Sequence, residues 1–188
     1  MPDDLSVQIG LLAEESAASA RTFLDTVTAL AAGDAPDQSL AVGLLALSEI
    51  LVMGARLGAM EDVVPDEQFE ADTGPEPEVD PLRESLANLF DGLDEYADLV
   101  DPLTDPTLTT GSLSNDLAVI SAALLHGLGH YEAGRPVEAL WWWQFSYLSD
   151  WGERAAMALR VLQSLLAHLR LDADPDLVAE AEFDALHP

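Results

Sequence analysis

The spacing of apolar residues constrains the fold of this chain more than any other feature. From Leu5 to Leu30, apolar and small residues recur every three or four positions, which predicts one helix over residues 4–32. Further helices are expected at 38–59, 81–99, 114–133, 136–151 and 153–171. No stretch shows the strict alternation of a half-buried strand. The sequence therefore predicts an all-α fold, a single-domain antiparallel helical bundle of about five to seven helices.

Residues that cap or break helices separate these segments. Asp37 can cap the second helix, and Pro136 opens the fifth at the first-turn position where proline is tolerated. Gly134 stands where a C-terminal glycine belongs, and Gly127 leaves room for a close approach between the fourth and fifth helices. The string "DPLTDPTLTTGS", residues 101–112, is expected to break the chain after the third helix.

Two acidic segments are predicted to lie outside the bundle. The string "EDVVPDEQFEADTGPEPEVD", residues 61–80, contains three prolines, one glycine and nine acids. Prolines and like charges oppose a helix, so one long acidic loop is predicted there. The acidic tail, 172–188, is set apart from the bundle domain, 1–171, and is expected to be irregular or to form a short helix.

The charge of the chain excludes several kinds of site. It carries 35 acids against seven basic residues, all of them arginine, and a formal charge of −28. A protein that binds nucleic acid directly needs a basic patch, and none is visible. Without cysteine there is no disulfide and no thiolate metal site. The acidity is interpreted either as a solvated surface or as a surface that steers a basic partner or imitates nucleic acid.

The chain is expected to be cytoplasmic. Its first residues, "MPDDLSVQIG", lack the basic start and the apolar stretch of a signal peptide. The longest apolar segment, 40–60, is interrupted by Glu49 and Arg56, so a membrane span is not expected.

The acids are unevenly distributed, and this points to a site. Residues 61–105 contain sixteen acids and one arginine, whereas residues 106–171 contain five acids and four arginines. The near-neutral block, 106–171, also holds all four tryptophans. Composition therefore places a binding site in that block.

Three tryptophans stand on consecutive positions of the fifth predicted helix. At roughly 100° per residue, Trp141 and Trp143 fall on or beside a face with Leu148 and Trp151, so both are expected in the core. Trp142 falls on the opposite side. Either another segment of the chain, such as the acidic loop, covers it, or it is an exposed anchor for a partner, a role in which tryptophan is enriched.

His126 and His130 lie four residues apart on one face of the fourth predicted helix. This spacing lets two imidazoles meet one metal ion. A third ligand would have to come from elsewhere, and Glu49 is the internal acid available. Two histidines without a convincing third ligand make a poor metal site, so we expect no metal and no cofactor. The histidines are interpreted either as structural or as ligand-binding or acid–base groups.

Glu49 and Arg56 lie seven residues apart on one face of the second predicted helix. That helix is apolar on most sides and is therefore expected to be buried. A buried charge must be paired or it destabilises the fold. Arg135, Arg154 and Arg160 are available partners. The two charges are interpreted either as part of an ion-pair network or as the polar lining of a pocket between helices.

The string "EALWWWQFSY", residues 138–147, followed by Trp151 and Gly152, is similar to a block in an actinobacterial family of small proteins of unknown function. The resemblance also covers "GARLGAMEDVVPDE" and "GPEPEVDPLRESL" and extends over roughly residues 5–171. It implies a cytoplasmic, acidic, all-α protein of unassigned activity. It also implies a partner in recombinational DNA repair, because genes of the family lie near one for that process. It supplies no catalytic residues.

Together these features predict a non-enzymatic interaction or regulatory module with no catalytic residues. Its acidic surface would steer another protein, one with a basic surface or linked to DNA repair, and the block from His126 to Trp151 would supply contacts. The alternative is a helical protein that binds a small molecule or a metal in a pocket lined by His126, His130, Glu49 and Arg135. The candidate contact residues are Trp142, His126, His130, Glu49, Arg56 and Arg135.

Overall fold

A computed structural model describes residues 2–34, 36–65, 75–101 and 103–171 of the chain. These residues are mostly helical and include one small antiparallel sheet. The elements are α1 (Pro2–Ala31), a 3-10 turn (Pro36–Gln38), α2 (Ser39–Gly58), α3 (Asp80–Leu89), β1 (Glu95–Asp101), β2 (Asp105–Ser112), α4 (Leu113–Glu132), α5 (Pro136–Ser146), a π-helical turn (Tyr147–Trp151) and α6 (Gly152–Leu171). The bounds predicted for every helix except the third agree closely with these.

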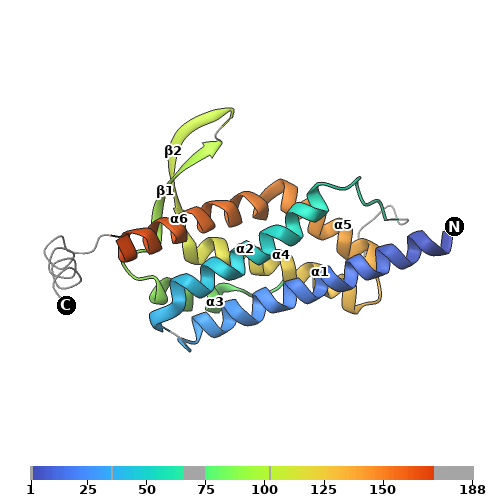
Figure 1. The fold of residues 1–188 in the computed structure, drawn as a ribbon, viewed down its shortest axis with the longest axis horizontal. Helices are drawn as coiled ribbons and strands as arrows, with labels where there is room; N and C mark the ends of the chain where they lie inside the picture. Colours follow the sequence, from blue (N-terminus) through green and yellow to red (C-terminus); the bar gives the residue numbers. More distant parts are fainter. Residues whose placement is uncertain (1, 35, 66–74, 102, 172–188) are drawn as a thin grey trace, which may run out of the picture.

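The helices pack side by side around one core and form what we call the helical body (Figure 1). α1 runs along its length, α2 returns beside α1, and α6 lies against α2. α4 contacts α1, α3, α5 and α6. Each helix contributes buried side chains, among them Phe23, Val27, Leu47, Ile50, Leu86, Leu117, Leu124, Trp143 and Leu162.

Residues 95–112 form a β-hairpin, which corrects the prediction of a purely α-helical fold. α3 ends at Leu89, and Gly92 turns the chain with φ of 76°, a conformation that glycine adopts without strain. β1 and β2 then pair antiparallel, with Glu95 opposite Ser112. Tyr96 and Leu99 continue the helical spacing of the leucines before them by coincidence, so the third helix was predicted to extend to residue 99. The threonines of β2 favour a strand, and they were the sequence signal for a β-hairpin.

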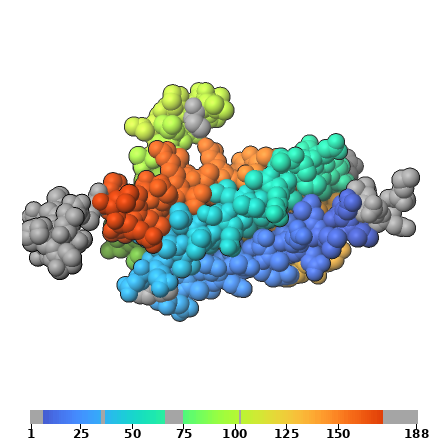
Figure 2. Space-filling model, viewed as in Figure 1, coloured from blue at the N-terminus to red at the C-terminus, as the bar shows by residue number. Residues whose placement is uncertain are grey.

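The hairpin is held largely by its own contacts. The Tyr96 ring lies over Gly111, where a Cβ atom would come within 3.0 Å of the ring. At the tip, the Asp101 carboxylate accepts hydrogen bonds from the backbone N–H groups of Leu103 at 2.6 Å and Thr104 at 2.8 Å. These contacts close the turn, and the hairpin stands clear of the helical body (Figure 2).

The described parts of the predicted acidic loop are irregular, as expected. Residues 61–65 and 75–79 form neither helix nor strand. The middle of that loop, 66–74, lies outside the described residues, and so does the predicted acidic tail, 172–188. Val63 packs against the core and thereby attaches the beginning of the loop to the helical body.

By length and composition alone, α2 could cross a membrane. In the structure it packs against both α1 and α6, and its inner face buries Leu47, Ile50 and Leu57. Its apolar residues therefore serve the core on one side, while the other side of the helix remains at the surface.

Candidate functional site

α5 turns one face toward the core. Trp143 is fully buried there, with Ala139 and Leu140 beside it. Its indole N–H donates a hydrogen bond to the carbonyl oxygen of Leu124 at 3.3 Å. Gly127 of α4 makes room for the ring, since a Cβ atom at that position would come within 3.0 Å of it. The predicted burial of Trp143 and the close approach of α4 and α5 are both confirmed.

Trp141 does not lie on this buried face, and the prediction that it packs in the core was wrong. The buried positions of α5 centre on Trp143, about a quarter turn away from the predicted face. Apolar residues occur on all sides of α5, so the helical wheel could not show which side meets the core. Leu148, also predicted on the core face, is 60% exposed.

The outer face of α5 carries an apolar stripe that is exposed except at Trp141, which is partly buried. Trp141 stacks on Phe145, with ring centroids 5.8 Å apart and ring planes at 10°. Phe145 is 52% exposed, and the exposed Leu148 continues the stripe. These side chains and residues 62–65, where Val64 is 76% exposed, line an open groove of about 430 Å³. We call this hollow the α5 groove.

Gln144 connects the two walls of the α5 groove, which are the α5 stripe and residues 62–65. Its buried side-chain amide donates hydrogen bonds to the carbonyl oxygens of Leu57 at 2.8 Å and Glu61 at 3.2 Å. Its Oε1 atom accepts a hydrogen bond from the N–H of Val63 at 2.7 Å. One side chain thus fixes the end of α2 and the residues after it against α5. Walls that are held in advance lower the ordering cost of binding.

The π-helical turn after α5 is fitted against α2 through glycines. Tyr147 and Trp151 lie edge to face, with ring centroids 4.9 Å apart. A Cβ atom on either Gly54 or Gly58 of α2 would come within 3.0 Å of the Tyr147 ring. Gly152 donates its N–H to the Tyr147 carbonyl oxygen and approaches it too closely for a side chain. This packing sets where α5 turns into α6 and leaves the middle of the turn at the surface.

Trp142 packs sideways onto α4. Its indole N–H donates a hydrogen bond to the carbonyl oxygen of Ala123 at 2.9 Å. Its ring lies against His126, with centroids 4.0 Å apart, and packs against the core. Another segment, α4, therefore covers part of Trp142. Its role as a partner contact stays a prediction.

His126 and His130 lie together on α4, as their spacing predicts. Their ring centroids are 5.2 Å apart; His130 is fully buried and His126 partly so. Within the described ranges, no group of three or more histidine, aspartate or glutamate side chains is placed to hold a metal ion. The histidine pair thus gains no third ligand from these residues, and the expectation of no metal remains a prediction.

The expected burial of Glu49 and Arg56 was wrong. Both side chains are exposed on α2, because only one side of this apolar helix faces the core. Glu49 lines a hollow of about 190 Å³ with Ala18 and Thr22 of α1, and neither histidine lines it. The geometry therefore gives no support to a pocket that joins Glu49 to the histidines.

Arg135, the remaining residue of that predicted pocket, stands at the N-terminus of α5. Its backbone N–H donates a hydrogen bond to the His130 carbonyl oxygen at 3.0 Å. Its Nη1 atom is buried and makes no hydrogen bond to any residue in the described part of the chain. The turn between α4 and α5 thus places the Arg135 backbone next to His130. The role of Arg135 as a contact residue stays a prediction.

A polar cluster that the sequence did not predict lies at the foot of the β-hairpin. Buried Asp116 accepts a hydrogen bond from the Tyr96 hydroxyl and pairs with Arg154 of α6 at 3.3 Å. Burial raises the pKa of Asp116 and outweighs the opposite effects of Tyr96 and Arg154. Burial, followed by the bond to Asp116, raises the pKa of Tyr96. Arg154, one of three arginines considered as partners for the charges of α2, pairs with Asp116 at this cluster instead.

The polar cluster borders a cavity of about 450 Å³ that also reaches the strands and the start of α6. Its members are far apart in sequence: Tyr96 and Arg154 are 20 and 38 residues from Asp116. No short motif could therefore have revealed them. Their mutual bonds connect β1, α4 and α6, which indicates that the cluster attaches the hairpin to the helical body.

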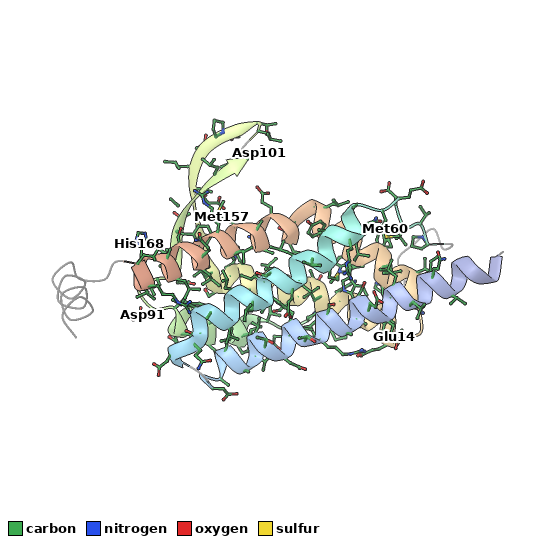
Figure 3. All side chains as sticks on the ribbon, in the orientation of Figure 1. Glu14, Met60, Asp91, Asp101, Met157 and His168 are labelled. Carbon is green, nitrogen blue, oxygen red and sulfur yellow. The ribbon has the colours of Figure 1, made fainter. Side chains whose placement is uncertain are left out.

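The α5 groove suits binding better than catalysis. Its described lining consists of apolar side chains with one carboxylate, Asp62, one hydroxyl, Ser149, and the amide of Gln144, which is already bonded. The groove lies away from the tip of the β-hairpin, as the positions of Met60, just before the groove wall, and Asp101 at the tip show (Figure 3), while Ser149 borders both the groove and the cavity beside the strands. The helical spacing of the stripe was the sequence signal for the groove.

Comparisons with known proteins place the chain in a family. No curated protein matches it. Its structure is similar to the crystal structure of protein BF1032 from Bacteroides fragilis, with a TM-score of 0.63 and 20% sequence identity over 80% of this chain and 89% of that chain. At this identity the similarity shows the fold alone. A family model described as "Domain of unknown function (DUF5063)" matches residues 9–168, which include the α5 groove. The chain therefore belongs to the family of this domain of unknown function, DUF5063.

Proposed function

We propose that this protein is a non-enzymatic interaction module, a cytoplasmic antiparallel helical bundle that binds another protein in the α5 groove. The observation that carries the proposal is the apolar stripe of Trp141, which is partly buried, and the exposed Phe145 and Leu148, beside exposed Val64. The proposed site takes one wall from the near-neutral block, 106–171, and the other from residues 62–65, and it lies on the outer face of α5 rather than at Trp142.

Burial of this stripe by a partner would be favourable. Phe145 and Leu148 each leave more than half of their surface exposed to water. Complete burial of such a side chain contributes roughly 1.5–3 kcal/mol. Trp141 lies beside them, and tryptophan is enriched among the residues that dominate binding energies. The stripe therefore offers enough apolar surface to anchor a partner.

Two further features support binding at this face. Gln144 holds the walls of the groove in place, so little has to become ordered on binding. The formal charge of −28 opposes association between copies of the chain and attracts partners of opposite charge. Both features favour a specific partner over self-association.

The proposal predicts that capture of a partner depends on the groove. The double variant Phe145→Ala/Leu148→Ala and the wild-type protein are each used for affinity purification from the native host, followed by mass spectrometry. A matched control, Leu45→Ala/Val52→Ala, removes two exposed apolar side chains from α2. We expect the groove variant to lose at least one protein that the wild type and the control both retain.

Thermal melts of the three proteins serve as the folding control, because all four substituted side chains are exposed. If the groove variant is folded and retains every protein bound by the wild type, the α5 groove is not the binding surface and the proposed function is wrong.

A further inference from the structure

Resting on the proposed function, we propose that the α5 groove binds one face of a basic amphipathic helix in the partner. Aliphatic side chains of that helix would contact Trp141, Phe145 and Leu148, and arginine or lysine residues on its flanks would face the acidic surroundings. Three features of the groove carry this inference: the spacing of the stripe, the state of its main-chain groups and its charge.

The stripe has the geometry of a helix-packing face. Trp141 and Phe145 lie at positions i and i+4 of α5, and Leu148 of the π-helical turn continues the row at i+7, so that all three line the groove over roughly 10 Å. Rows of this spacing form ridges that fit between the side-chain rows of a second helix. Residues 62–65 form the opposite wall, held by the hydrogen bond from the Val63 N–H to Gln144. The groove is thus an open trough about two helical turns long.

The main-chain groups of the α5 wall favour a helix over an extended segment. An extended segment binds where it can pair with free N–H and C=O groups, as at a sheet edge. α5 uses its main-chain groups within its own helix, and the Val63 N–H is already bonded to Gln144. An extended segment lying along α5 would therefore find no main-chain partners on that wall. A helix satisfies these groups internally.

The charge of the groove selects a basic partner. Asp62 is the one charged residue in the described lining, and Glu61 precedes it, with its carbonyl oxygen bonded to Gln144. A second copy of the chain would bring another formal charge of −28 to this face and would be repelled. Arginine and lysine on the flanks of a partner helix would instead be attracted. The occupant is therefore a basic helix of another protein.

Two synthetic peptides of about 18 residues, or five helical turns, test the inference. Both carry leucine at helical spacing, and the remaining positions are lysine and arginine in one peptide and glutamate in the other. Isothermal titration calorimetry measures their binding to the full-length wild type, to Phe145→Ala/Leu148→Ala and to the control Leu45→Ala/Val52→Ala. We expect the basic peptide to bind the wild type and the control at least about tenfold more tightly than the groove variant. The acidic peptide should not bind.

A single-charge variant adds a second measurement. Asp62→Asn should weaken binding of the basic peptide by about two- to fivefold, the effect of one exposed ion pair. If the groove variant does not fold, Leu148→Gln replaces it, because this side chain lies at the surface.

Three outcomes would overturn the inference. The first is a basic peptide that binds all variants equally, which would reveal attraction to the acidic surface in general. The second is an acidic peptide that binds as tightly as the basic one. The third is a wild-type dimer in sedimentation equilibrium that Phe145→Ala/Leu148→Ala dissociates, since a second copy would then occupy the groove. If native partners are captured through the groove but the basic peptide binds independently of it, this inference is rejected and the proposed function stands.

Discussion

The inner and outer sides of α5 are built from the same kinds of residue but differ in their surroundings. On the inner side, Trp143 is fully buried, bonded to Leu124 and fitted against Gly127. On the outer side, Trp141 stacks on Phe145 beside a groove open to water. The tryptophan between them packs onto α4.

This difference separates stability from binding along a single helix. Consecutive helical residues point roughly 100° apart, so three neighbouring tryptophans must enter three environments. Trp143 stabilises the core, Trp142 connects α4 to α5, and Trp141 remains available to a partner. Substitutions at adjacent positions should therefore have clearly different effects, and the size of each effect tests the comparison.

The largest loss is expected for Trp143→Ala. The substitution empties a fully buried site and removes the hydrogen bond to Leu124, so the free energy of unfolding should fall by about 3–5 kcal/mol. Urea denaturation followed by circular dichroism measures it. A loss below about 1 kcal/mol would show that the inner side of α5 is not part of the core.

Gly127→Ala, on α4, tests how closely α4 packs against the buried side of α5. The added methyl group would overlap the Trp143 indole, which is packed on all sides and cannot move away. Overpacking of this kind costs about 1–3 kcal/mol, although alanine favours the helix more than glycine does. Combining it with Trp143→Leu should remove most of this cost. An additive loss in the double variant would contradict the proposed overlap.

An intermediate loss is expected for Trp142→Ala. This side chain is only partly buried, but it packs on His126 and donates to Ala123, so we expect a loss of about 1–2 kcal/mol. Trp142→Phe keeps a ring and removes the hydrogen bond, so it should lose about 0.5–1.5 kcal/mol. Thermal melts can rank the two variants. A loss as large as that of Trp143→Ala would place Trp142 in the core proper.

The smallest change in stability is expected for Trp141→Ala. Its ring contacts Phe145 at the surface, so the free energy of unfolding should change by less than about 1 kcal/mol. Capture of the native partner should nevertheless fall, since Trp141 lines the α5 groove. A variant that loses stability but keeps its partner would reverse the roles assigned to the two sides of α5.

The helix boundaries were largely predictable because their signals are local. The start of α5 at Pro136 and the end of α4 before Gly134 follow from residues that act within one turn. The apolar period shows that a segment is helical, but not which of several apolar sides is buried. For this reason Trp141 and Leu148 of the α5 region were wrongly predicted to lie in the core. Glu49 and Arg56 of α2 were wrongly predicted to be buried, whereas both are exposed.

The β-hairpin was missed for a related reason. Tyr96 and Leu99 of β1 continue the helical spacing of α3, and the contact of the Tyr96 ring with Gly111 joins two strands across a turn. The bond from Tyr96 to Asp116 and the pairing of Asp116 with Arg154 span three elements. Such contacts exist only after the elements have packed.

The sequence by itself determined that this chain is acidic, mostly helical and divided at particular capping residues, because propensity, charge and apolar period act over a few residues. It also pointed to the near-neutral block that holds the tryptophans, from which the proposed α5 groove takes one of its two walls. Only the tertiary structure decided which tryptophan is buried, since the choice depends on where Gly127 lets α4 approach α5 and where Gly54 and Gly58 receive Tyr147. The exposed face that remains, with Gln144 holding its opposite wall, is what makes the α5 groove.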